Sequence, residues 1–109
     1  ESAKLENMVA SHLLKFVHFL VDREGYKAEL FFLRDIEGRE VDFLVAIDKK
    51  PWFAVEVKMT ESEPSKTLRF FQNKLKIPFA YQIIREQGID FLQNNIRIMS
   101  ASFFLSGLV

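Results

Sequence analysis

The chain contains no cysteine among its 109 residues. This absence excludes disulfide bridges and thiolate metal ligands, and it is typical of a reducing compartment, so we expect a cytoplasmic protein. No apolar run reaches the ~18–20 residues that a membrane-spanning helix requires, and no membrane function is expected. The first residues lack the basic-then-apolar pattern of a signal peptide. They also lack an initiator methionine, and we interpret the chain as a piece of a longer protein.

Net charge is also absent, because 15 Lys and Arg residues balance 15 Asp and Glu residues. Nucleic-acid-binding domains are more often basic, so a nucleic acid would have to be held by a local patch. The chain is rich in apolar side chains, with 49% hydrophobic residues and 12 Phe. This composition indicates one globular domain with a modest, aromatic-rich core.

Hydrophobic periodicity and turn residues predict alternating helices and strands. The expected helices cover 3–23, a segment that starts within 62–65 and ends near 75, and 102–108; the expected strands cover 26–34, 40–47, 52–58, 79–84 and 96–101, with a short helix or a loop at 88–95. This α-β-β-β-α-β order predicts an α/β fold in which helices flank a mixed sheet. Strands 40–47 and 52–58 would be central because their apolar runs are long.

Three charged side chains interrupt these two apolar strands. Asp42 lies within 40–47, and Glu56 and Lys58 lie within 52–58. Side chains alternate between the two faces of a strand, so Glu56 and Lys58 point the same way. Burial of a carboxylate costs free energy unless it is paired, hydrogen-bonded or bound to a metal. These positions therefore need an explanation other than core packing.

The turn between the two strands decides how the charged residues pair. A three-residue loop at 48–50 would place Asp42 directly opposite Glu56, and Glu40 opposite Lys58, all on one face. A two- or four-residue loop would shift this register. Opposed carboxylates repel, so one would take up a proton or both would share a divalent cation. Carboxylate oxygens together with waters suit Mg²⁺ or Mn²⁺.

Glu6 is a further acidic residue in an apolar setting. At ~100° per residue it falls within the apolar face of the first helix, and it could reach the face of Asp42 and Glu56 if that helix covers it. Together with Lys58, these residues are the groups needed for metal-assisted phosphodiester hydrolysis. The metal would neutralise phosphate charge and lower the pKa of the attacking water. Lys58 would stabilise developing charge or orient that water.

The order of these motifs resembles a known superfamily. Asp42 followed by Glu56-Val57-Lys58 resembles the D…(D/E)-x-K signature of the PD-(D/E)XK nucleases. The predicted element order is similar to their restriction-endonuclease-like core. Segments 5–10 (LENMVA), 38–43 (GREVDF) and 55–58 (VEVK) resemble one branch, a domain of unknown function at the C-terminus of many prokaryotic AAA+-type ATPases. The resemblance covers 1–109 as a single domain.

This resemblance implies a metal centre that binds Mg²⁺ or Mn²⁺. Asp42 and Glu56 would be the metal ligands, with the backbone carbonyl of Val57 as a candidate third. The implied function is that of a nuclease-like domain, and the implied partner is nucleic acid, most naturally DNA.

The resemblance also implies roles for three more side chains and a partner module. Lys58 would be the catalytic lysine, Glu6 the acid that several nuclease branches place on the first helix, and Gln72 the active-site glutamine of the second helix. The chain has no G-x-x-x-x-G-K-[ST] loop, so it would be the C-terminal part of a larger ATPase whose ATPase module lies upstream.

Other interpretations remain open at this point. Asp42, Glu56 and Lys58 could form a structural ion pair on a solvated sheet face, and Glu6 could occupy an exposed rim of its helix. The domain could be a non-catalytic relative that binds nucleic acid or docks a protein, which the neutral net charge favours. The apolar tail at 103–108 could instead mediate assembly of the ATPase.

Overall fold

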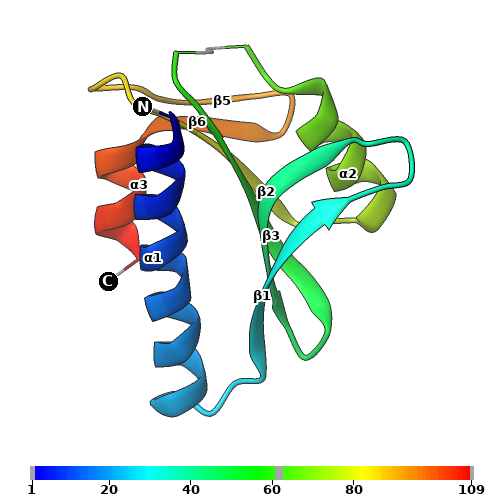
Figure 1. Cartoon of the computed structure of the whole chain (residues 1–109), viewed down its shortest axis with the longest axis vertical. Helices are drawn as coiled ribbons and strands as arrows, with labels where there is room; N and C mark the ends of the chain where they lie inside the picture. Colours follow the sequence, from blue (N-terminus) through cyan, green and yellow to red (C-terminus); the bar gives the residue numbers. More distant parts are fainter. Residues whose placement is uncertain (1, 61–62, 109) are drawn as a thin grey trace.

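A computed structural model describes residues 2–60 and 63–108, and it contains one mixed sheet with helices on both faces (Figure 1). The elements in chain order are α1 (Ser2–Asp22), β1 (Ala28–Arg34), β2 (Glu40–Ile47), β3 (Lys50–Lys58), α2 (Lys66–Leu75), β4 (Phe79–Ile84), β5 (Asp90–Gln93), β6 (Ile96–Ser100) and α3 (Ala101–Gly107). The predicted α/β class and the α-β-β-β-α-β order are confirmed. Position 62, where helix-start signals begin in the sequence, lies outside the described residues.

The six strands lie in the order β1-β2-β3-β4-β6-β5. β1, β2 and β3 form an antiparallel meander, β3, β4 and β6 are parallel, and β5 is antiparallel to β6. β2 and β3 are therefore both interior strands, as their long apolar runs predicted. The crossover through α2 makes the β3–β4 pairing parallel.

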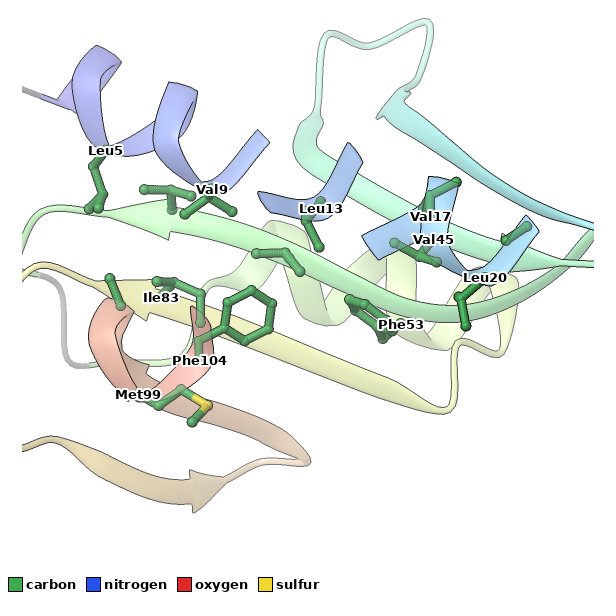
Figure 2. Packing of buried hydrophobic residues seen from close by; sticks show 14 residues of the cluster. Leu5, Val9, Leu13, Val17, Leu20, Val45, Phe53, Ile83, Met99 and Phe104 are labelled. Atoms are coloured by element: carbon green, nitrogen blue, oxygen red, sulfur yellow. The ribbon is translucent and has the colours of Figure 1, made fainter. Parts of the chain in front are cut away.

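α1 and α3 cover one face of the sheet and α2 covers the other (Figure 1). The apolar stripe predicted for α1 is buried against the sheet and α3 at Leu5, Val9, Leu13, Val17 and Leu20 (Figure 2), and its remaining member, Phe16, is partly buried against the same cluster. These side chains meet a second set contributed by the strands and α3, which includes Val45, Phe53, Ile83, Met99 and Phe104. A separate apolar cluster lies between the sheet and α2.

The turn between β2 and β3 differs from the predicted three-residue loop. Asp48 and Lys49 form a two-residue turn in which both φ angles are positive, 51° and 64°, and Ile47 pairs with Lys50. Positive φ at both central residues is typical of the tight hairpin turns whose twist matches the flanking strands. The predicted loop length was therefore wrong.

A β-bulge next to this turn restores the predicted register. Val45 pairs with Phe53, whereas Ala46 pairs with Pro51, so β3 contains one extra residue at Trp52. Pro51 suits this position because it has no backbone N–H to donate to the ladder. Beyond the bulge, the strands pair as a three-residue loop would have paired them.

The segment 88–95 contains a strand where a short helix or a loop was expected. β5 pairs with β6 through a tight turn at Asn94 and Asn95, whose φ angles are 52° and 66°. Asn tolerates this left-handed conformation better than most residues. The Asn-Asn dipeptide was therefore an available hairpin signal. Within the described ranges, none of the helices is both long and apolar enough to cross a lipid bilayer.

We predict that Lys49→Gly stabilises the domain, because Lys49 has a left-handed backbone with φ of 64°. Glycine adopts this conformation without steric cost, and the expected gain is about 0.5–1 kcal/mol in the free energy of unfolding. The matched control is Lys50→Gly, one residue further on inside β3, which should cost about 0.5–1 kcal/mol. Urea unfolding of both variants makes the measurement, and equal destabilisation by both would contradict the prediction.

Candidate functional site

The candidate site lies where β2 and β3 separate. Their backbone pairing ends at Phe43 and Val55, although both strands continue for three more residues. In the gap, the Val57 N–H donates to Asp42 Oδ2 at 2.8 Å. A side-chain carboxylate thus satisfies a backbone donor that the separated strand leaves unpaired.

A bulge in β2 accompanies this separation. The β1–β2 register shifts between Phe31 and Leu33, so two β2 residues, Asp42 and Phe43, face a single residue of β1. Bulges bend a strand locally and re-aim its side chains. The bulge therefore helps to place the Asp42 carboxylate between the two strands.

Glu56 is buried beside Asp42, with only 6% of its surface exposed. Lys58 Nζ lies 3.3 Å from Glu56 Oε2. Burial raises the pKa of Glu56 and the charge of Asp42 raises it further, while Ser65 and Lys58 oppose that rise. The fold therefore disfavours the ionised form of this side chain.

Asp42 has the same electrostatic character. Burial raises its pKa and the charge of Glu40 adds to the rise, against the opposing effects of the Val57 N–H and Lys58. Glu40, predicted to lie opposite Lys58, forms an ion pair with Arg34 of β1 at 3.4 Å. Asp42 and Glu56 are thus two neighbouring carboxyl groups, and the fold disfavours the ionised form of both.

Glu6 approaches Asp42 from the opposite side of the sheet. Val55 and Val57 pack in the cluster under α1, so Glu56, which lies between them, points toward α2. Glu6 belongs to α1, where burial raises its pKa and the charge of Asp42 raises it further. Glu6 was expected to share the face of Glu56 only if α1 covered that face, and α1 covers the other one, so Glu6 neighbours Asp42 from the opposite side.

Gln72 is buried at 4% exposure, but its hydrogen bond leads away from this pair of carboxylates. Its Nε2 donates to the Asn95 carbonyl at 3.2 Å, in the turn between β5 and β6. Its Oε1 is buried with no hydrogen-bond partner among the described residues. The structure thus gives Gln72 a contact at the β5–β6 turn.

Gln82 and Ser65 are the residues of this region that sequence reasoning missed. Gln82 is fully buried on β4 and is the Cα partner of Glu56 in the parallel register. Its Oε1 accepts from the Ser65 N–H and its Nε2 donates to the Glu63 carbonyl, both at 2.8 Å. The available signal was an amide side chain within an apolar strand, the same signal that singled out Glu56.

A divalent cation such as Mg²⁺ requires oxygen ligands. In the part of the chain that the structure describes, no three Asp, Glu, His or Cys side chains are grouped so that they could hold a metal. Asp42 and Glu56 supply two carboxylates. The Val57 carbonyl points to the same side as its N–H in a regular strand, which is the side of Asp42. One or two carboxylates with several waters suit Mg²⁺, so this donor set fits Mg²⁺ or Mn²⁺.

We predict that Glu56→Gln stabilises the metal-free domain at neutral pH. The folded pKa of Glu56 is raised above its ordinary value of 4.5, so its contribution to stability is full below that value and is lost as the pH rises through the folded pKa. The variant should therefore unfold a few degrees above wild type at pH 8, and the difference should shrink toward pH 5. Thermal unfolding in chelator tests this, with the exposed acid variant Glu29→Gln as control. A difference that does not change with pH would contradict it.

No curated protein and no solved structure matches the chain. One family model does match, over residues 1–104, and its description is a domain of unknown function. Because the match covers nearly the whole chain, the protein belongs to the DUF4143 family.

Proposed function

We propose that this domain is nuclease-like and carries out metal-assisted hydrolysis of phosphodiester bonds in nucleic acid, with Mg²⁺ or Mn²⁺ as cofactor. One observation carries the proposal: Asp42 and Glu56 meet where β2 and β3 separate, both with raised pKa values, beside the Lys58 ammonium group. Perturbed carboxylates close to a lysine are typical of functional sites.

The charge balance of the cluster supports a divalent cation. Glu6, Asp42 and Glu56 bring three negative charges when all are ionised, and Lys58 brings one positive charge, which leaves two negative charges. Burial makes that excess costly. A divalent cation would neutralise it, whereas the Glu56–Lys58 ion pair alone leaves the charges of Asp42 and Glu6 uncompensated.

Each group has a distinct role in the proposed chemistry. Asp42, Glu56 and the Val57 carbonyl would hold the cation, which when bound supplies charge for the phosphate and lowers the pKa of a coordinated water. Lys58 is tethered to Glu56, but 39% of its side chain is exposed, so its ammonium group can meet a phosphate oxygen. Glu6 would add negative charge beside Asp42 and strengthen attraction for the cation.

The order of the sequence motifs also supports the proposed function, independently of the structure. Asp42 and Glu56-Val57-Lys58 resemble the PD-(D/E)XK signature, in which these residue types act on nucleic acid. The resemblance to the C-terminal part of AAA+-type ATPases suggests that DNA is the substrate and that an upstream ATPase module is the partner. The neutral composition implies that DNA would be held near the cation rather than on a broadly basic surface.

A non-catalytic docking role is the second candidate, and the β1 edge of the sheet favours it. β1 is an edge strand, and Phe32 on it is 71% exposed. Ile36, in the following turn, has its side chain fully in solvent. Exposed apolar side chains on a sheet edge are typical of sites that accept another protein chain. In this alternative the acid cluster would serve no reaction.

We predict that Mn²⁺ and Mg²⁺ raise the thermal unfolding temperature of the wild-type domain, because they neutralise the excess charge of the folded site. Asp42→Asn and Glu56→Gln should abolish that response. The matched control is Glu29→Gln, which removes an exposed acid from β1 and should leave the response intact. A wild-type domain that shows no shift with either metal and cleaves neither plasmid nor single-stranded DNA would exclude the nuclease proposal.

We predict that Lys58→Ala leaves metal binding intact and impairs DNA cleavage. Lys58 is not proposed as a ligand, so the variant should keep the Mn²⁺-dependent shift in unfolding temperature. Cleavage of plasmid DNA should fall by about 100-fold or more, which is the usual effect of removing a group that stabilises transition-state charge. Cleavage at the wild-type rate would remove Lys58 from the proposed mechanism.

A further inference from the structure

The start of α2 lies beside the carboxylate of Glu56. Ser65 is the N-cap of α2, and its Oγ accepts a hydrogen bond from the Leu68 N–H at 3.1 Å. The Ser65 N–H donates to Gln82, the β4 residue paired in register with Glu56, and the same hydroxyl lowers the pKa of the Glu56 carboxyl, as a hydrogen-bond donor to it would. A hydroxyl has one proton and two lone pairs, so it can cap the helix as an acceptor and bind the carboxylate as a donor.

We infer that Ser65 is a positioning residue for Glu56 and that Gln82 holds Ser65 in place. The inference rests on the proposed function, in which Glu56 is a metal ligand. Carboxylates that bind metals are themselves hydrogen-bonded, and this outer set of bonds fixes their orientation. Ser65 is placed to provide such a bond from the side of α2, opposite to the side from which Glu6 approaches.

Gln82 anchors the segment that carries Ser65. Its Oε1 accepts from the Ser65 N–H and its Nε2 donates to the Glu63 carbonyl, both at 2.8 Å. The two bonds lie on either side of Pro64, so they fix the backbone at both ends of this short segment. Because Gln82 is fully buried on β4 next to Glu56, the sheet itself sets the distance from Ser65 to Glu56.

The main test compares two substitutions of Ser65 in the whole domain. Ser65→Gly removes the hydroxyl but costs the helix start little, since glycine is an adequate N-cap. Ser65→Thr keeps a hydroxyl at the same place. Isothermal titration with Mn²⁺ should show about 10- to 100-fold weaker binding for Ser65→Gly, and near wild-type binding for Ser65→Thr. A purely structural helix cap would not produce this difference in affinity.

A metal-free measurement tests the link independently of cation binding. Urea unfolding measures how far Ser65→Gly lowers the midpoint concentration of urea. The measurement is made in the wild-type background and in a Glu56→Ala background, as in a double-mutant cycle. The loss should be larger in the wild-type background, because only there does the hydroxyl serve a buried carboxylate. Gln82→Met keeps the side-chain bulk and removes both hydrogen bonds of the side-chain amide. It should weaken Mn²⁺ binding, as Ser65→Gly does.

The outcomes separate this inference from the function on which it rests. Equal losses in the two backgrounds, together with unchanged Mn²⁺ affinity for Ser65→Gly, would overturn the positioning role. Unequal losses in a wild-type domain that binds no Mn²⁺ would support the Ser65–Glu56 link and overturn the proposed metal site.

Discussion

The hydrogen bond from the Val57 N–H to the Asp42 carboxylate is the interaction on which the candidate site depends. It replaces backbone pairing at the point where β2 and β3 separate beyond Phe43 and Val55. A neutral side chain without an acceptor would leave the Val57 N–H unpaired in a half-buried gap, which is costly. The carboxylate accepts a hydrogen bond from this N–H, but it also places a negative charge between the strands. The raised pKa values of Glu6 and Glu56 both reflect that charge in part.

Two helices on opposite faces of the sheet approach this charge in different ways. α1 contributes Glu6, which adds repulsion, whereas Ser65, the N-cap of α2, opposes the rise in the pKa of Glu56. Both meet at the C-terminal end of β3, where the chain leaves the sheet toward α2. In sheets with parallel strands, this end is where connections diverge and ligands bind. The topology therefore brings residues that are distant in sequence to one edge of the sheet.

The sequence predicted the register of Phe43 with Val55 correctly although the loop on which that register was based was wrong, and the strands separate before Asp42 and Glu56 could pair. The actual turn is shorter, and an extra residue at Trp52 compensates for it. Alternation of apolar and charged residues fixes which side chains share a face, but a bulge depends on sheet twist and on packing against other elements. The prediction of Gln72 came from resemblance alone, whereas Gln82 required knowledge of which strand lies beside β3. That neighbour is set by a crossover, and local pattern does not reveal it.

The proposed cation would also account for the charge balance of the cluster. An ion pair between Glu56 and Lys58 would be neutral by itself, and replacing it by apolar residues would often be neutral or stabilising. Asp42 and Glu6 instead make the region more negative, and the fold disfavours the ionised form of each. An anionic phosphate would be repelled from such a region unless a cation were bound first. In the proposed function, Lys58 alone would offer one positive charge against three negative ones, so attraction of a phosphate would require the cation, with the lysine acting beside it.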